Sequence, residues 1–247
     1  MQSWGLTDPG CVRKQNQDAY RIEELDSNTL LCVVCDGMGG AKSGNVASML
    51  AVEVFVEEVR RCYSPAMESD RVDQMLRSAV KLANFTVFDQ AAQFEEFDGM
   101  GTTMVAALIR RQKATIVNVG DSRAYFIDRS GIRQITKDHS LVQFMVDRGE
   151  LTAETAKSYP GKNFITRAIG TEPMVMCDIY HQAVSKGDYL LLCSDGLWER
   201  LHEDEIMLDL HKSQTPDQWL SNLRCRAELR KYTDVDNNTA VAVYVTV

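Results

Sequence analysis

Three short apolar segments follow one another closely in the middle of the chain, and their spacing constrains the fold more than any other feature. They are Thr102–Ile109, Ala114–Val119 and Ala124–Asp128, and their composition is typical of β-strands. Parallel neighbours would need a crossover of a dozen or more residues between them, and these gaps are far shorter. We therefore expect a largely antiparallel sheet.

The remaining elements place the chain in the α+β class. Further strands are expected at Leu30–Cys35, Val175–Tyr180, Tyr189–Cys193 and Thr239–Val245. Two long helices are expected after the caps Ser43 and Asp70, and shorter ones at Leu141–Arg148, Glu203–His211 and Asp217–Leu229. The helices are grouped rather than alternating with the strands, which excludes a doubly wound sheet. Because no Gly/Ser-rich linker interrupts the chain, we expect one domain over residues 1–247.

Composition excludes several classes of protein. The chain has 247 residues, 45% of them hydrophobic, so long disorder is not expected. Its 27 basic and 35 acidic residues give a net charge of −8, which argues against a nucleic-acid binder. No apolar run approaches the roughly 18 residues of a membrane span, and Met1–Trp4 does not begin a signal peptide. We expect a cytoplasmic protein with no membrane partner.

The cysteines do not indicate metal, redox or nucleophilic chemistry. Seven cysteines are present, mostly within apolar runs, which is typical of a reducing compartment. Cys32 and Cys35 form a C-x-x-C, but residues three apart on a strand point to opposite faces. A phosphatase with a cysteine nucleophile would have an arginine six residues after that cysteine, and none of the seven does.

A glycine-rich segment, Asp36–Gly44, follows an expected strand and precedes an expected helix, as a phosphate-binding loop would. Ala41 stands where the P-loop pattern requires glycine before the lysine. Lys42 stands where the dinucleotide-binding pattern requires its last glycine. A nucleotide-binding protein is therefore a disfavoured alternative.

Aspartates recur at the ends of the expected strands. They are Asp36, Asp121, Asp195 and Asp236, and Asp18 joins the set from the stretch Asn16-Gln17-Asp18. A single Asp-Gly sequence is most simply interpreted as a turn, but the recurrence of aspartates beside strands weakens that interpretation. Carboxylates that follow neighbouring strands can converge at one edge of a sheet. Oxygen ligands without nearby His or Cys suit Mg²⁺ or Mn²⁺.

The chain resembles a known family, the bacterial metal-dependent protein serine/threonine phosphatases of the 2C type (the PPM family). The resemblance runs from Gly5 to Val245. The matching stretches occur in the family's order: Thr7–Arg13, Asn16–Asp18, Val34–Gly40, Gly101–Thr103, Asn118–Arg123, Asp138–Ser140, Ile165–Gly170, Cys193–Trp198 and Asp236–Thr239. Each stretch is a weak signal alone, whereas the ordered set is specific.

The resemblance implies a fold and a metal centre. The fold is a four-layer αββα sandwich of two antiparallel sheets flanked by helices. The cofactor is Mn²⁺ or Mg²⁺, with two ions per chain. Asp36 is implied to bridge the two ions, and the Gly37 carbonyl to bind one of them. Asp195 and Asp236 are implied to bind the other. Asp121 is similar to the residue that holds a third, weaker ion in bacterial members.

The resemblance also implies the reaction. Water activated by the two metals would hydrolyse phosphoserine and phosphothreonine in proteins. Arg13 is similar to the family's anchor for the substrate phosphate, and Asp18 lies near the third metal in a supporting role. The implied partners are phosphorylated proteins, the substrates of a serine/threonine kinase in bacterial signalling. We expect a monomer.

Two departures keep an alternative open. Met38 stands where many eukaryotic members have a proposed general acid, and Gln17 where a glutamate helps to hold one metal. The alternative is a catalytically impaired, phosphatase-like regulatory binding module. His139 is either a proton source or a structural residue at a helix start. The family's flap corresponds to residues 137–167, which either select substrates or form a surface hairpin without a role.

Overall fold

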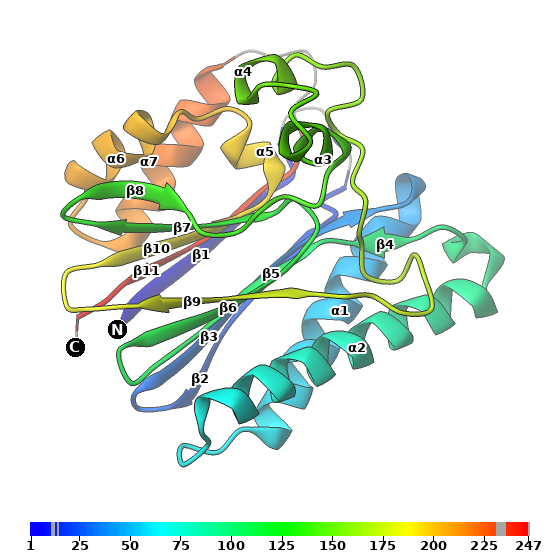
Figure 1. Cartoon of the computed structure of the whole chain (residues 1–247), viewed down its shortest axis with the longest axis horizontal. Coiled ribbons are helices and arrows are strands. Elements are labelled where there is room, and N and C mark those ends of the chain that lie inside the picture. Colours follow the sequence, from blue (N-terminus) through cyan, green and yellow to red (C-terminus); the bar gives the residue numbers. More distant parts are fainter. Residues whose placement is uncertain (11–12, 14, 231–235, 247) are drawn as a thin grey trace.

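The computed structural model describes residues 1–10, 13, 15–230 and 236–246, with only the backbone for 40–42. Across these residues two antiparallel sheets pack face to face, with helices on the outer side of each (Figure 1). The first sheet has the order β1-β11-β10-β7-β8. Its strands are β1 (Gln2–Asp8), β11 (Asn238–Tyr244), β10 (Tyr189–Cys193), β7 (Arg123–Asp128) and β8 (Gly131–Gln134).

The second sheet has the order β2-β3-β5-β6-β9, with the short β4 paired to β3. Its strands are β2 (Asp18–Asp26), β3 (Thr29–Met38), β4 (Gly101–Thr102), β5 (Met104–Arg110), β6 (Lys113–Val119) and β9 (Asp178–Ala183). Strands β5 and β6 are joined by a tight turn, as the short gap between them predicts. The expected α+β class and the four-layer sandwich are both confirmed.

Helices cover the two outer faces. Helices α1 and α2 pack on the second sheet, and α6 and α7 pack on the first (Figure 1). The helices are α1 (Gly40–Cys62), α2 (Ser69–Gln93), a 3₁₀ turn η1 (Glu95–Phe97), α3 (Leu141–Asp147), α4 (Ala153–Ala156), α5 (Asp195–Trp198), α6 (Glu203–His211) and α7 (Pro216–Leu229). No helix within the described residues is long and apolar enough to cross a bilayer.

Strand β3 lies between two apolar layers. Leu31, Val33 and Cys35 belong to the core beneath α1 and α2, whereas Leu30, Cys32 and Val34 belong to the core between the sheets. The two cysteines therefore point to opposite faces, as the alternation of a strand predicts. All six cysteines in the described part of the chain are free thiols.

Three expected boundaries are wrong. Helix α1 begins at Gly40, directly after Gly39 with a φ of 116°, so Ser43 lies inside the helix and is not its cap. Helix α2 begins at Ser69, which puts Asp70 in the first turn. The strand expected at Val175–Tyr180 is β9, which starts later. The reason is that α2 side chains bind the preceding segment: Asn84 donates to the Glu172 carbonyl and Arg77 to the Cys177 carbonyl.

The sequence analysis did not predict strands β1, β2 and β8. Their residues are mostly half-buried or exposed, whereas those of the central strands β5 and β6 are buried almost throughout. Each of the three lies at the edge of its sheet. An edge strand buries less of its surface, so its apolar pattern is weaker.

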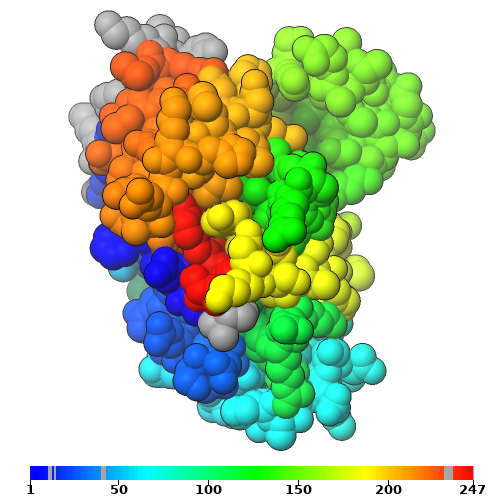
Figure 2. All heavy atoms as spheres, turned by 90° about the vertical axis from the view of Figure 1, so that its left-hand side faces the viewer, coloured from blue at the N-terminus to red at the C-terminus, as the bar shows by residue number. Residues whose placement is uncertain are grey.

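Most of the segment 137–167 stands apart from the two sheets, although Asp138, His139 and Ser140 at its start are buried. It carries α3 and α4, and no residue of either helix is buried. Figure 2 shows this part of the chain, in lime, protruding from the rest of the molecule. Helix α3 matches the expected helix closely and is capped by Ser140, whose hydroxyl accepts from the Gln143 N–H.

Candidate metal centre

The five aspartates come from both sheets. Asp18 opens β2 and lies directly opposite Asp36 of β3 in the antiparallel register. Asp121 follows β6, Asp195 follows β10 as the first residue of α5, and Asp236 precedes β11. Burial, and then repulsion from the other four carboxylates, raises the pKa of Asp36. The side chains therefore lie close enough for their charges to act on one another.

Burial and like charge make four of these carboxyl groups, those of Asp18, Asp36, Asp121 and Asp195, hard to ionise. Burial, and then repulsion by neighbouring aspartates, raises the pKa of Asp36 and of Asp121 well above its usual range. Burial likewise raises the pKa of Asp18 to about 7 and that of Asp195 to about 6. Hydrogen bonding with the Asp36 side chain acts in the opposite direction on both. Asp36 therefore links Asp18 with Asp195.

The Ser194 hydroxyl connects the Asp18 carboxylate of one sheet to the backbone of the other. Ser194, at the end of β10, donates its hydroxyl to Asp18 Oδ2 at 2.8 Å. The Ser194 hydroxyl also accepts from the Thr239 N–H, and the Ser194 N–H donates to the Thr239 carbonyl. Through these bonds Asp18 in the second sheet is fixed to β10 and β11 in the first.

The backbone of Asp36 is fixed by two threonines. Its N–H donates to the Thr103 hydroxyl at 2.9 Å. Its carbonyl accepts from the Thr103 N–H and the Thr102 hydroxyl, each at 2.8 Å. These bonds fix the backbone from which the Asp36 side chain extends, and they explain the two threonines of the Gly-Thr-Thr stretch.

Gly37 and Gly196 allow backbone segments to approach the site closely. A Cβ at Gly37 would lie 2.0 Å from the Gly44 carbonyl oxygen, and one at Gly196 would lie 2.0 Å from the Asn237 carbonyl oxygen. Neither neighbour is a flexible side chain, so any larger residue would displace the backbone beside Asp36 or Asp195. The position after each of these two aspartates therefore requires glycine for steric reasons, and not only because the chain turns there.

Arg13 lies at the solvent side of the centre. Its Nη2 is 2.8 Å from Asp236 Oδ2, and both side chains are close to half exposed. An exposed ion pair of this kind contributes little stability. Its guanidinium can therefore exchange one anionic partner for another.

The oxygen atoms of the centre suit a hard divalent cation. Asp18 Oδ1 and Asp195 Oδ1 are buried and accept no hydrogen bond. Ionised carboxylates offer only acceptors, and a cation would satisfy these atoms and offset the repulsion between them. In the described part of the chain, no group of three or more His, Cys, Asp or Glu side chains is placed to hold a metal ion as it stands.

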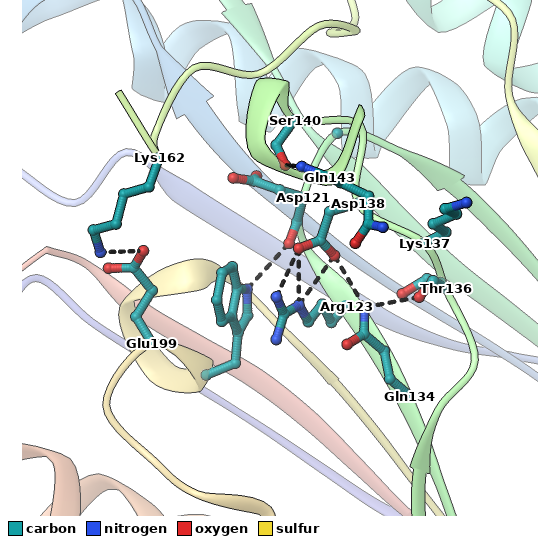
Figure 3. A network of polar contacts seen from close by, with 12 residues as sticks. Asp121, Arg123, Gln134, Thr136, Lys137, Asp138, Ser140, Gln143, Lys162 and Glu199 are labelled. Carbon is teal, nitrogen blue, oxygen red and sulfur yellow. Dashed lines mark hydrogen bonds and ion pairs between the residues drawn. The ribbon is translucent and has the colours of Figure 1, made fainter. Parts of the chain in front are cut away.

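A polar network that the sequence analysis did not identify borders the centre (Figure 3). Arg123 donates to both oxygens of Asp138 at 2.7–3.2 Å, and its guanidinium lies 3.3 Å from the centre of the Trp198 ring. Lys162, in the segment 137–167, pairs with Glu199 at 2.7 Å. The motif stretches contain Arg123, Asp138 and Trp198, but only the folded chain brings them together.

His139 is held in a structural position. Its Nδ1 accepts from the Gly120 N–H at 3.1 Å, and its Nε2 lies 3.2 Å from Asp178 Oδ2. Both ring nitrogens are thus engaged, and burial lowers the pKa of the imidazole. This arrangement favours the interpretation of His139 as a structural residue at the start of α3.

Comparison with known proteins gives one consistent result. The Protein phosphatase 2C family model matches residues 12–231. The serine/threonine phosphatase stp of Listeria monocytogenes is 34% identical over 237 residues, covering 96% of this chain and 93% of that protein. The protein phosphatase PhpP of Streptococcus pneumoniae is 34% identical, covering 85% of this chain and 84% of that protein.

Solved structures agree with the sequence relatives. The serine/threonine phosphatase Stp1 from Staphylococcus aureus superposes with a TM-score of 0.90 at 35% identity, covering 99% of this chain and 95% of that one. The Mycobacterium tuberculosis serine/threonine phosphatase PstP/Ppp gives a TM-score of 0.85 at 28% identity, covering 100% and 99%.

The repulsion at Asp36 generates a prediction about stability. Burial and repulsion make the pKa of this carboxyl group higher in the folded chain than in the unfolded chain. Between these two pKa values the folded chain still holds the proton and the unfolded chain has lost it. Raising the pH through this range therefore destabilises the fold. In EDTA, Asp36→Asn should therefore raise the Tm at pH 7.5, and the gain should shrink at pH 5. A gain of about 1 kcal/mol corresponds to roughly 2–4 °C in a chain of this size.

Asp128→Asn is the matched control, measured by thermal unfolding in the same buffers. Asp128 lies outside the centre, and bonds from Ser130 and Arg133 lower its pKa to about 2. Its substitution should give no gain that depends on pH between 5 and 7.5. An Asp36→Asn protein that melts at or below the parent's Tm at pH 7.5 would contradict the repulsion.

Proposed function

Because the chain belongs to the protein phosphatase 2C family and is a protein serine/threonine phosphatase, we propose that its five converging aspartates hold the divalent ions used in hydrolysis. The family depends on metal ions. The observation that carries the proposal is the repulsion of the Asp36 carboxylate by its four neighbours, together with two buried oxygens, Asp18 Oδ1 and Asp195 Oδ1, that accept no hydrogen bond. Such an arrangement is costly unless a cation offsets it.

We assign the ligands from the resemblance to the family. Asp36, which interacts with both Asp18 and Asp195, would be shared by two ions, Mn²⁺ or Mg²⁺. The Gly37 carbonyl would help to hold one ion, and Asp195 and Asp236 would hold the other. Asp121 would hold a third, weaker ion. When bound, two such ions lower the pKa of a water molecule and offset the charge that develops at phosphorus.

The chain's own residues position the substrate and the carboxylates. Arg13 binds phosphate oxygens through its planar, always charged guanidinium, releasing Asp236 as it does so. Asp18 supports the centre through its bond from Ser194, without touching the substrate. Water attacks phosphorus, and the serine or threonine oxygen leaves. No cysteine takes part as a nucleophile.

The substrates are phosphorylated proteins, and the enzyme opposes a serine/threonine kinase in bacterial signalling. It acts as a monomeric, single-domain enzyme in the cytoplasm, where its free cysteines remain reduced. The exposed segment 137–167 is the flap beside the site and contributes to substrate selection. An impaired regulatory module is not favoured, because a chain freed from catalysis would gain stability by losing these repelling carboxylates.

Turnover with p-nitrophenyl phosphate and a phosphothreonine peptide tests the proposal. Activity should require Mn²⁺ or Mg²⁺ and disappear in EDTA. Asp36→Asn and Asp195→Asn should lower kcat by roughly 10³-fold, the scale of losing a preorganised electrostatic contact, while Asp128→Asn should keep the parent's rate. Full activity in EDTA, or an active Asp36→Asn protein, would be incompatible with the assignment.

Arg13 should act mainly in binding. Arg13→Ala should raise KM for the phosphopeptide about tenfold or more with a smaller change in kcat, because it removes binding that the ground state and transition state share. Arg21→Ala is the matched control, since Arg21 is an exposed arginine paired with Glu23 on β2. An unchanged KM in Arg13→Ala, measured by initial rates, would show that this arginine does not bind phosphate.

A further inference from the structure

Trp198 connects the two chain segments that carry Asp121 and Asp195. It is the last residue of α5, a single helical turn whose first residue is Asp195. Its indole Nε1–H donates to the backbone carbonyl of Asp121 at 3.1 Å. The loop after β6, in the second sheet, is thereby held against the helix that follows β10, in the first. The two carboxylates are close enough for the charge on Asp195 to act on Asp121.

Arg123 holds the indole in place. Its guanidinium carbon lies 3.3 Å from the centre of the Trp198 ring, and the guanidinium edge donates to both oxygens of Asp138 (Figure 3). Its remaining end donates to the Tyr125 hydroxyl at 3.1 Å. Asp138 is itself buried and also accepts from Gln134. The arginine is therefore fixed on three sides, and the tryptophan can adopt few other orientations.

We infer that Arg123 and Trp198 form a positioning unit that sets the separation of Asp121 from Asp195 and so determines the affinity of the weakest metal site. The inference rests on the proposed function, because it concerns the third ion assigned to Asp121. Neither residue touches the substrate or supplies a metal ligand. They act on the backbone that carries Asp121, and they leave the pairing of Asp18 with Asp36 unchanged.

A purely structural role would have a different signature. Trp219 makes the same kind of bond, from its indole N–H to the Ile206 carbonyl at 3.2 Å, in the core beneath α6 and α7. Arg226 makes the same kind of two-point contact, with Asp209 at 2.7 Å. Changes at these residues remove equivalent interactions away from the metal centre, so they serve as matched controls.

The experiment measures Mn²⁺ binding to metal-depleted protein by titration calorimetry and by the EPR signal of free Mn²⁺, without substrate. The variants are Trp198→Phe, which keeps an aromatic ring but loses the N–H, and Arg123→Lys, which keeps the charge but loses the planar fork. Each should weaken the weakest class of Mn²⁺ site by about five- to tenfold, the effect of one lost hydrogen bond. The tighter class should change by less than about twofold.

The controls Trp219→Phe and Arg226→Lys should lower Tm and leave all Mn²⁺ affinities at the parent's values. The inference is overturned if neither test variant lowers the Mn²⁺ affinity of the weakest class of site, or if both classes lose affinity equally. It is also overturned if the control variants lower the affinity of the weakest class as much as the test variants do. If the parent protein binds Mn²⁺ in a single class of site, the inference is overturned but the proposed function is not. A parent that binds no Mn²⁺ overturns the proposed function and the inference with it. Two test variants keep the result decisive if one of them does not fold.

Discussion

The repulsion between carboxylates at one edge of the sandwich is the interaction on which the rest of this structure depends. Asp36 lies among four other aspartates, and its pKa rises because burial and their charges disfavour ionisation. A folded chain tolerates such an arrangement when a bound cation offsets the repulsion between the carboxylates. Two divalent ions would change the net charge from −8 to −8 + 4 = −4. With Arg13, they would make the site locally attractive to an anionic phosphoprotein.

The sandwich brings these charges together with few specific contacts. Strands β3, β6 and β10 end, and strands β2 and β11 begin, near this edge, so residues far apart in sequence meet there. Ser194 joins the sheets by donating to Asp18 while pairing with Thr239, and the threonines after Gly101 fix the backbone of Asp36. The apolar cores on both sides of β3 make that strand rigid. Rigidity matters here because relaxation would let the carboxylates move apart.

Much of the architecture could be predicted from the sequence, and the reasons are local. The strands between Thr102 and Asp128 are buried and closely spaced, so their antiparallel pairing follows from chain geometry. Helix α6 was expected within the bounds observed. The edge strands β1 and β2 were missed because they bury less, and the caps of α1 and α2 were misplaced because glycine and backbone geometry begin those helices. Strand β9 was misplaced because Asn84 and Arg77 hold the preceding segment against α2.

The candidate site was predictable as a set of carboxylates but not as a network. Aspartates after strand ends can be seen in the sequence, and their convergence follows from the sheet. The stacking of Arg123 on Trp198 depends on two segments that are 75 residues apart in the numbering and on different elements, and no local pattern indicates it. The same holds for the pair Lys162 and Glu199, which ties the protruding segment to the residue after α5.

The most direct measurement of the central claim is a crystal structure of the protein grown with Mn²⁺, with anomalous scattering recorded at the manganese edge. We expect two strong anomalous peaks whose ligands include Asp36, the Gly37 carbonyl, Asp195 and Asp236. Crystals that contain Mn²⁺ elsewhere, with the five carboxylates left in contact with one another, would contradict it.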